Sequence, residues 1–130
     1  MKYFLDTNII VYAVKGKFPK IRKHFERIPA TSIVVPSIVC AELEYGARRS
    51  RDYKKTKALY DAFLQEFQIA PFDKAAAKAY GKIRHQLEEQ GTPVGPNDLV
   101  IAATAMGGCL VTHNVREFSR IEGLNIEDWT

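Results

Sequence analysis

Four acidic side chains stand near the ends of predicted strands and helices, where the active sites of α/β proteins form. Asp6 directly follows residues 3–5, a short and aromatic-rich run that predicts a buried strand. The other three acids are Glu42, Asp98 and Glu117. We expect them to gather around Asp6, although several carboxylates within a few ångströms cannot all stay ionised without a counter-charge.

A divalent cation would supply that counter-charge, and an all-oxygen ligand set suits Mg²⁺ or Mn²⁺ rather than zinc. The three histidines are scattered along the chain, and Cys40 and Cys109 lie among apolar neighbours without metal-type spacing. Beside a basic surface, a cluster of metal and carboxylates predicts hydrolysis of a phosphodiester. The metal would activate a bound water and stabilise the leaving oxygen.

Glu42 is the most informative of the four acids because of the helix predicted around it. It falls between two groups of an apolar arc, whereas Glu44 lies on the opposite, polar face and is expected to be solvated. The arc comprises Val39, Leu43, Gly46 and Ala47, extended by Ile38 and Tyr45. An inward carboxylate is costly unless its charge is compensated, and the structural alternative is a pair with Arg or Lys.

The other acids also have structural alternatives. The helix dipole alone favours Asp98 in a first turn, by about 0.3–1 kcal/mol, and Pro96 suits the first helical position. The stretch Leu99–Met106 is apolar nearly all round, which predicts a buried helix whose first turn lies at the end of the core, where clefts form. For Glu117 the structural alternative is a surface charge, and for Thr112 it is a turn residue.

Short apolar segments alternate with helical patterns along the whole chain. Strands are predicted at 3–5, 32–36, 69–70, 109–112 and, at an edge, 124–126. Helices are predicted at 9–14 with Thr7 or Asn8 as N-cap, 19–28, 38–49 after Ser37, 53–67 after Asp52, 74–89 after Asp73, 96–106 and 115–119. This alternation predicts an α/β fold, a three-layer α/β/α sandwich with a short parallel sheet, in one domain of residues 1–130.

The net charge of +4 conceals an asymmetry between the two halves of the chain. Residues 1–57 carry 13 Lys and Arg against 5 acids, and residues 58–130 carry 6 against 10. Two basic clusters cause this: Lys15, Lys17, Lys20, Arg22, Lys23 and Arg27, then Arg48, Arg49, Arg51, Lys54, Lys55 and Lys57. Each suits a polyanion; the alternative is a solvated helix face. The presence of two such clusters near an acidic site favours nucleic acid as the binding partner.

The sequence predicts no membrane segment and no leader. The longest nearly apolar run, Leu99–Met106, is far short of the roughly 20 residues that a membrane helix needs. Asp6 and Asn8 interrupt what would be the apolar part of a signal peptide. The two cysteines are expected to be buried, reduced thiols, with a disulfide as the alternative. A cytoplasmic location is therefore expected.

Four motifs, in this order and spacing, resemble the PIN-domain family. They are Leu5-Asp6-Thr7-Asn8-Ile9, Ala41-Glu42-Leu43-Glu44-Tyr45-Gly46, Gly95-Pro96-Asn97-Asp98 with Ile101-Ala102-Ala103, and Val111-Thr112-His113-Asn114 with Glu117-Phe118. The closing segments Ile121-Glu122-Gly123-Leu124 and Glu127-Asp128-Trp129 resemble its VapC toxin branch. The likeness covers essentially the whole chain.

The resemblance implies a Mg²⁺- or Mn²⁺-dependent endoribonuclease that acts on structured RNA, often transfer RNA. It further implies the toxin of a toxin–antitoxin pair, a homodimer inhibited by a VapB-type antitoxin. By motif, the metal ligands would be Asp6, Asp98 and Glu42, and the supporting polar groups Asn8, Thr112 and Asn114. Glu117 takes the fourth acidic position, where the family often has the shorter Asp.

Two other classes compete with this hypothesis. A phosphoryl-accepting receiver also uses a parallel sheet, strand-end acids and Mg²⁺, but it needs an adjacent acidic pair after the first strand. Residues 2–7 contain the single acid Asp6. A binding module that keeps the fold without catalysis is the other alternative, and Glu117 in the fourth acidic position is its only support.

Overall fold

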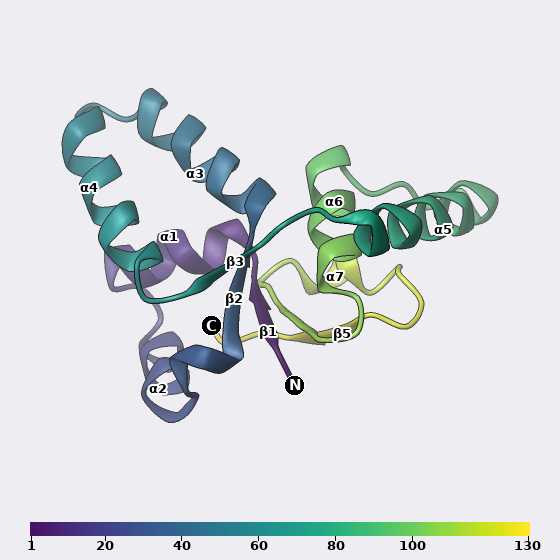
Figure 1. Cartoon of the computed structure of the whole chain (residues 1–130), viewed down its shortest axis with the longest axis horizontal. Helices are drawn as coiled ribbons and strands as arrows, with labels where there is room; N and C mark the ends of the chain where they lie inside the picture. The colour runs from purple at the N-terminus through teal and green to yellow at the C-terminus, as the bar shows by residue number, and fades with distance from the viewer.

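The computed structural model describes all 130 residues, and five short strands form one wholly parallel sheet (Figure 1). The strands are β1 (Tyr3–Leu5), β2 (Ile33–Pro36), β3 (Gln68–Ala70), β4 (Cys109–Val111) and β5 (Asn125–Glu127). Every predicted strand is present, and no end differs from its predicted position by more than one residue. Ser32 belongs instead to a short 3₁₀ turn, η1 (Ala30–Ser32), directly before β2.

Seven helices connect the strands. They are α1 (Thr7–Lys15), α2 (Pro19–Arg27), α3 (Ser37–Arg49), α4 (Tyr53–Leu64), α5 (Lys74–Gln90), α6 (Pro96–Ala105) and α7 (Val115–Phe118). Asp52 and Asp73 cap α4 and α5 as predicted, because each carboxylate accepts a backbone N–H of the first turn. Ser37 is not a cap but the first residue of α3. Helix α4 ends at Leu64, three residues before its predicted end.

The order of the strands decides which helices cover which face. The chain moves from β1 to β2 to β3 in one direction and then returns to add β4 and β5 on the other side of β1. Since such crossovers are right-handed, α1 to α4 cover one face and α5 to α7 the other, and Figure 1 shows this division. The predicted three-layer α/β/α sandwich is confirmed.

The same order excludes the receiver alternative. Doubly wound folds of the receiver type have strand order 2-1-3-4-5, whereas here β1 lies between β2 and β4. The direction of winding reverses between β1 and β4, and in open α/β sheets ligands bind at the carboxyl ends of the strands beside such a reversal. Asp6 and Thr112 directly follow these two strands.

The sheet is buried on both faces by a single cluster of apolar side chains. Val35, Leu110 and Val111 are fully shielded from solvent. Helix α6 is largely buried from Leu99 onward, as predicted, whereas its first two residues, Pro96 and Asn97, are exposed. Both cysteines are free thiols, Cys109 buried and Cys40 half-buried. None of the helices is both long and apolar enough to cross a bilayer.

Two glycines provide a matched test of this packing. A side chain at Gly108, just before β4, would begin 2.6 Å from the carbonyl oxygen of Lys2 and 2.6 Å from the ring of Phe4. Around Gly81, in the exposed face of α5, nothing lies within 4 Å. We expect Gly108→Ala to lower the free energy of unfolding by about 1–3 kcal/mol through overpacking. Gly81→Ala should raise it by roughly 0.5–1 kcal/mol.

Urea denaturation of the two variants and the parent measures both effects. Equal changes of the same sign would show that the contact between the start of β4 and β1 is not close-packed in solution.

Candidate active site

The topology brings the four acids to one edge of the sheet, because each belongs to a helix that starts there. Helices α1, α3 and α7 begin within four residues of the ends of β1, β2 and β4, respectively. Helix α6 precedes β4 and runs back across the sheet, so its first turn also lies at the carboxyl edge. Asp6 caps α1, Glu42 lies in the second turn of α3, Asp98 in the first turn of α6, and Glu117 in α7.

Asp6 is the most enclosed of these carboxylates, with 6% of its surface exposed. One oxygen, Oδ1, accepts the backbone N–H of Thr7 at 2.8 Å, so Asp6 itself caps α1 where Thr7 or Asn8 was predicted to do so. The other, Oδ2, accepts the hydroxyl of Thr112 at 2.7 Å. Burial raises the pKa of Asp6, these two hydrogen bonds oppose the rise, and the charges of Glu42 and Glu117 add to it.

Thr112 joins two parts of the site although it is fully buried. While its hydroxyl donates to Asp6, it accepts the backbone N–H of Asn114 at 3.0 Å. The Asn114 side chain in turn donates to Oε2 of Glu117 at 2.6 Å. Polar contacts therefore run without a break from Asp6 through Thr112 and Asn114 to Glu117.

Glu42 is held by neutral donors rather than by a cation. Its Oε1 accepts the hydroxyl of Thr7, and its Oε2 accepts the side-chain amide of Asn97 at 3.3 Å. No Arg or Lys pairs with it, so the structural alternative for this acid is wrong. The roles of Thr7 and Asn97 were not predicted, although both stand within the motifs beside predicted acids.

Asp98 and Glu117 lie close together, on either side of the same glycine, Gly95. Burial, followed by the charges of Asp6, Glu117 and Glu42, raises the pKa of Asp98 to about 7. Glu117 also accepts the backbone N–H of Gly95 at 2.9 Å. A Gly95 side chain would begin 3.7 Å from Oδ2 of Asp98 and 3.8 Å from Oε1 of Glu117, so both carboxylates border this glycine.

The remaining predictions around the site have mixed outcomes. Asn8 is exposed and its side chain forms no hydrogen bond, so its supporting role stays a prediction. Tyr45 and Gly46 are exposed rather than part of the inward arc of α3. Glu44 is not simply solvated: hydrogen bonds from Tyr53 and Arg48 lower its pKa to about 2, and Lys57 adds a third.

The donor set suits a hard divalent cation in type and charge. All four site carboxylates lack an ion pair with Lys, Arg or His. Oxygen donors of this kind select Mg²⁺ or Mn²⁺. As the side chains stand, no three acidic, histidine or cysteine groups converge on one point as metal ligands. Glu42 and Glu117 instead direct their oxygens to the neighbouring donors described above.

Comparison with known families identifies the family of the chain. The model of the PIN domain matches residues 3–124. The chain belongs to the PIN-domain family. The resemblance inferred from the four motifs is thereby confirmed, and all four acids lie within the matched residues.

Individual relatives fall in the VapC branch of the family. The chain is 38% identical to the tRNA(fMet)-specific endonuclease VapC of Shigella flexneri over 100% of this chain and 99% of that protein. It is 39% identical to the ribonuclease VapC2 of Rickettsia felis, covering 99% and 98%. A crystal structure of DNA-bound VapBC from Salmonella typhimurium superimposes with a TM-score of 0.94 at 39% identity, covering 100% and 99%.

The raised pKa of Asp98 predicts how stability depends on pH without metal. This carboxyl ionises near 3.8 in the unfolded chain but near 7 in the folded one, so stability falls as pH rises between these values. In EDTA, Asp98→Asn should therefore raise the Tm at about pH 8, with a smaller gain at about pH 5, where folded Asp98 still holds its proton.

Thermal unfolding at the two pH values provides the measurement, and Glu122→Gln is the control because Glu122 is an exposed acid outside the site. If Asp98→Asn changed the Tm equally at both pH values, the crowding of carboxylates around Asp98 would be disproved.

Proposed function

We propose that this protein is a metal-dependent endoribonuclease that hydrolyses transfer RNA and acts as the toxin of a toxin–antitoxin pair. The observation that carries the proposal is the cluster of four carboxylates, none paired with a cation, at the reversal point of the sheet. The names of the VapC relatives support RNA as the substrate. The expected cytoplasmic location belongs to the same proposal.

Asp6, Asp98 and Glu42 would hold Mg²⁺ or Mn²⁺. When bound, such an ion lowers the pKa of a coordinated water and stabilises charge on the leaving oxygen. The residues around it fix the carboxylates: Thr112 orients Oδ2 of Asp6, and Asn114 with the Gly95 N–H orients Glu117. Partners of this kind are typical of metal sites, where they set the direction of each ligand.

Asp6→Asn tests the catalytic part of the proposal. The change keeps the size of the side chain but removes the most enclosed negative charge, so we expect cleavage of labelled transfer RNA to fall by about 100-fold or more. EDTA should abolish the parent activity, and added Mg²⁺ or Mn²⁺ should restore it.

Glu122→Gln again serves as control and should cleave like the parent. A metal-dependent site at these residues would be refuted if Asp6→Asn cleaved transfer RNA as fast as the parent, or if EDTA did not reduce cleavage by the parent.

The proposed partners are a VapB-type antitoxin and a second copy of the chain.

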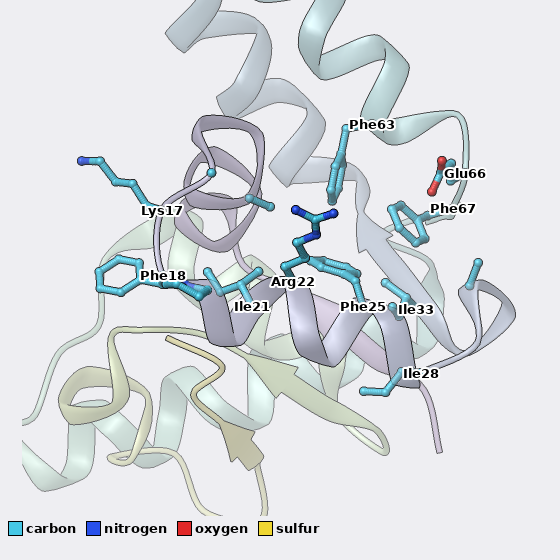
Figure 2. Close-up of a pocket in the computed structure, with 14 residues that line it drawn as sticks. Lys17, Phe18, Ile21, Arg22, Phe25, Ile28, Ile33, Phe63, Glu66 and Phe67 are labelled. Carbon is cyan, nitrogen blue, oxygen red and sulfur yellow. The ribbon is translucent and has the colours of Figure 1, made fainter.

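An apolar groove of about 550 Å³ lies between α2 and α4, lined by phenylalanines that include Phe25, Phe63 and Phe67. Figure 2 shows the guanidinium of Arg22 extending toward Phe63, with Lys17 and Phe18 at one end of the groove. Lys17 and Arg22 contribute two positive charges to the groove and Glu66 one negative charge. An apolar groove with a net positive charge suits an amphipathic, acidic segment of an antitoxin. We propose that the antitoxin binds here.

Phe18→Asp should weaken antitoxin binding. Phe18 is 39% exposed and has a φ of 55°, which Asp tolerates better than most residues, so the variant is expected to fold. Loss of this aromatic contact, with a charge added at the groove, should raise the Kd for the cognate antitoxin roughly 10-fold or more.

Titration calorimetry with the purified antitoxin measures the effect. Phe72→Asp is the matched control, because Phe72 is 40% exposed but lies outside the groove. Unchanged affinity for Phe18→Asp would place the antitoxin elsewhere.

A further inference from the structure

One face of α3 connects the acidic site to a basic end of the molecule. Tyr45 lies three positions and Arg49 seven positions after Glu42, so the three residues follow one another along the same side of the helix. Tyr45 is thus about 5 Å and Arg49 about 10 Å further along the axis than Glu42. The opposite edge of α3, at Glu44, is occupied by Tyr53 and Lys57 of α4. At the edge that carries Glu42, the carboxylate contacts Thr7 of α1 and Asn97 of α6, whereas Tyr45, one turn further along, is exposed to solvent.

Some of the cations near the C-terminal end of α3 are paired with an acid and others are not. Arg48 and Lys57 form ion pairs with Glu44, at 2.8 and 3.3 Å. The other four have no acidic partner. These are Arg49, Arg51, Lys54 and Lys55, and they lie at the junction of α3 and α4, which Figure 1 shows at the periphery of the molecule, away from the sheet.

Tyr45 and Arg49 form an exposed surface between the acids and the other three unpaired cations. The Tyr45 side chain is 63% exposed, which is high for an aromatic residue. The guanidinium of Arg49 lies 5.5 Å from the centre of its ring, within the range of a cation–π contact. Gly46 adds no side chain here, and its surroundings are open. Arginine and tyrosine faces are the surfaces on which proteins stack nucleobases.

We propose that this α3 face, defined by Tyr45 and Arg49, binds an unpaired segment of the RNA beside the bond that the acids cleave. Tyr45 stacks on a nucleobase, while Arg49 and the three cations after it contact the phosphates. Only unpaired bases expose their faces for such stacking, so the site selects loops over duplex. This inference rests on the proposed ribonuclease function and adds to it the determinants of substrate binding.

Binding without cleavage tests the inference, with an Asp98→Asn protein and a fluorescent RNA stem-loop as probe. In that background Tyr45→Ala should weaken binding about 5- to 100-fold, the scale of one stacked base, and Tyr45→Phe should retain it. Arg49→Gln should lower the slope of log affinity against log salt by about 0.7, the loss of one contact to a single strand. Tyr45→Ala should leave that slope unchanged.

Lys78→Gln on α5 removes the same charge outside the α3 face and should alter neither quantity. A fully paired RNA of equal length should bind more weakly than the stem-loop, and Tyr45→Ala should not change its affinity. The inference would be overturned if Tyr45→Ala bound the stem-loop as tightly as the parent. It would also be overturned if the substitution changed the mass of the oligomer and left RNA binding unchanged, because the face would then be an interface between proteins. Failure of the proposed function is a separate result: the protein without the Asp98 change would then cleave no RNA at all.

Discussion

The repulsion among carboxylates at one edge of a parallel sheet is the constraint on which the rest of the structure depends. Four acids from four helices meet there without a cationic side chain, and burial leaves the charge of Asp6 and Asp98 poorly solvated. Neutral donors limit the cost: Thr7 and Asn97 bind Glu42, and Thr112 binds Asp6. Because neutral donors add no positive charge, these contacts leave the negative charge of the site uncompensated, which is the basis for the proposed cation.

The fold makes this concentration of charge tolerable through the arrangement of its strands. Winding in one direction from β1 to β3 and then returning for β4 leaves β1 and β4 adjacent, with their connecting helices on opposite faces. Asp6 and Thr112 therefore meet across neighbouring strands although 106 positions separate them in the chain. The densely packed strands and α6 below supply the stability that a cluster of like charges removes.

The sequence was sufficient for the order of the elements and for the four acids, because strand ends and helix starts carry strong local signals. It was not sufficient for contacts that depend on how helices sit against one another. Asn97 binds Glu42 only because α6 starts beside α3. The helical wheel made Tyr45 an extension of the apolar arc, but the fully buried residues of α3 are Val39, Leu43 and Ala47, and Tyr45 is exposed.

The first turn of α6 contacts each of its acidic neighbours through a different group. The Gly95 N–H donates to Glu117, the Asn97 amide donates to Glu42, and Asp98 lies between them. A small tilt of this one helix would therefore displace Glu42, Asp98 and Glu117 together. A regulator that bound the outer part of α6 and tilted it would thus disturb three of the four acids without contacting any of them.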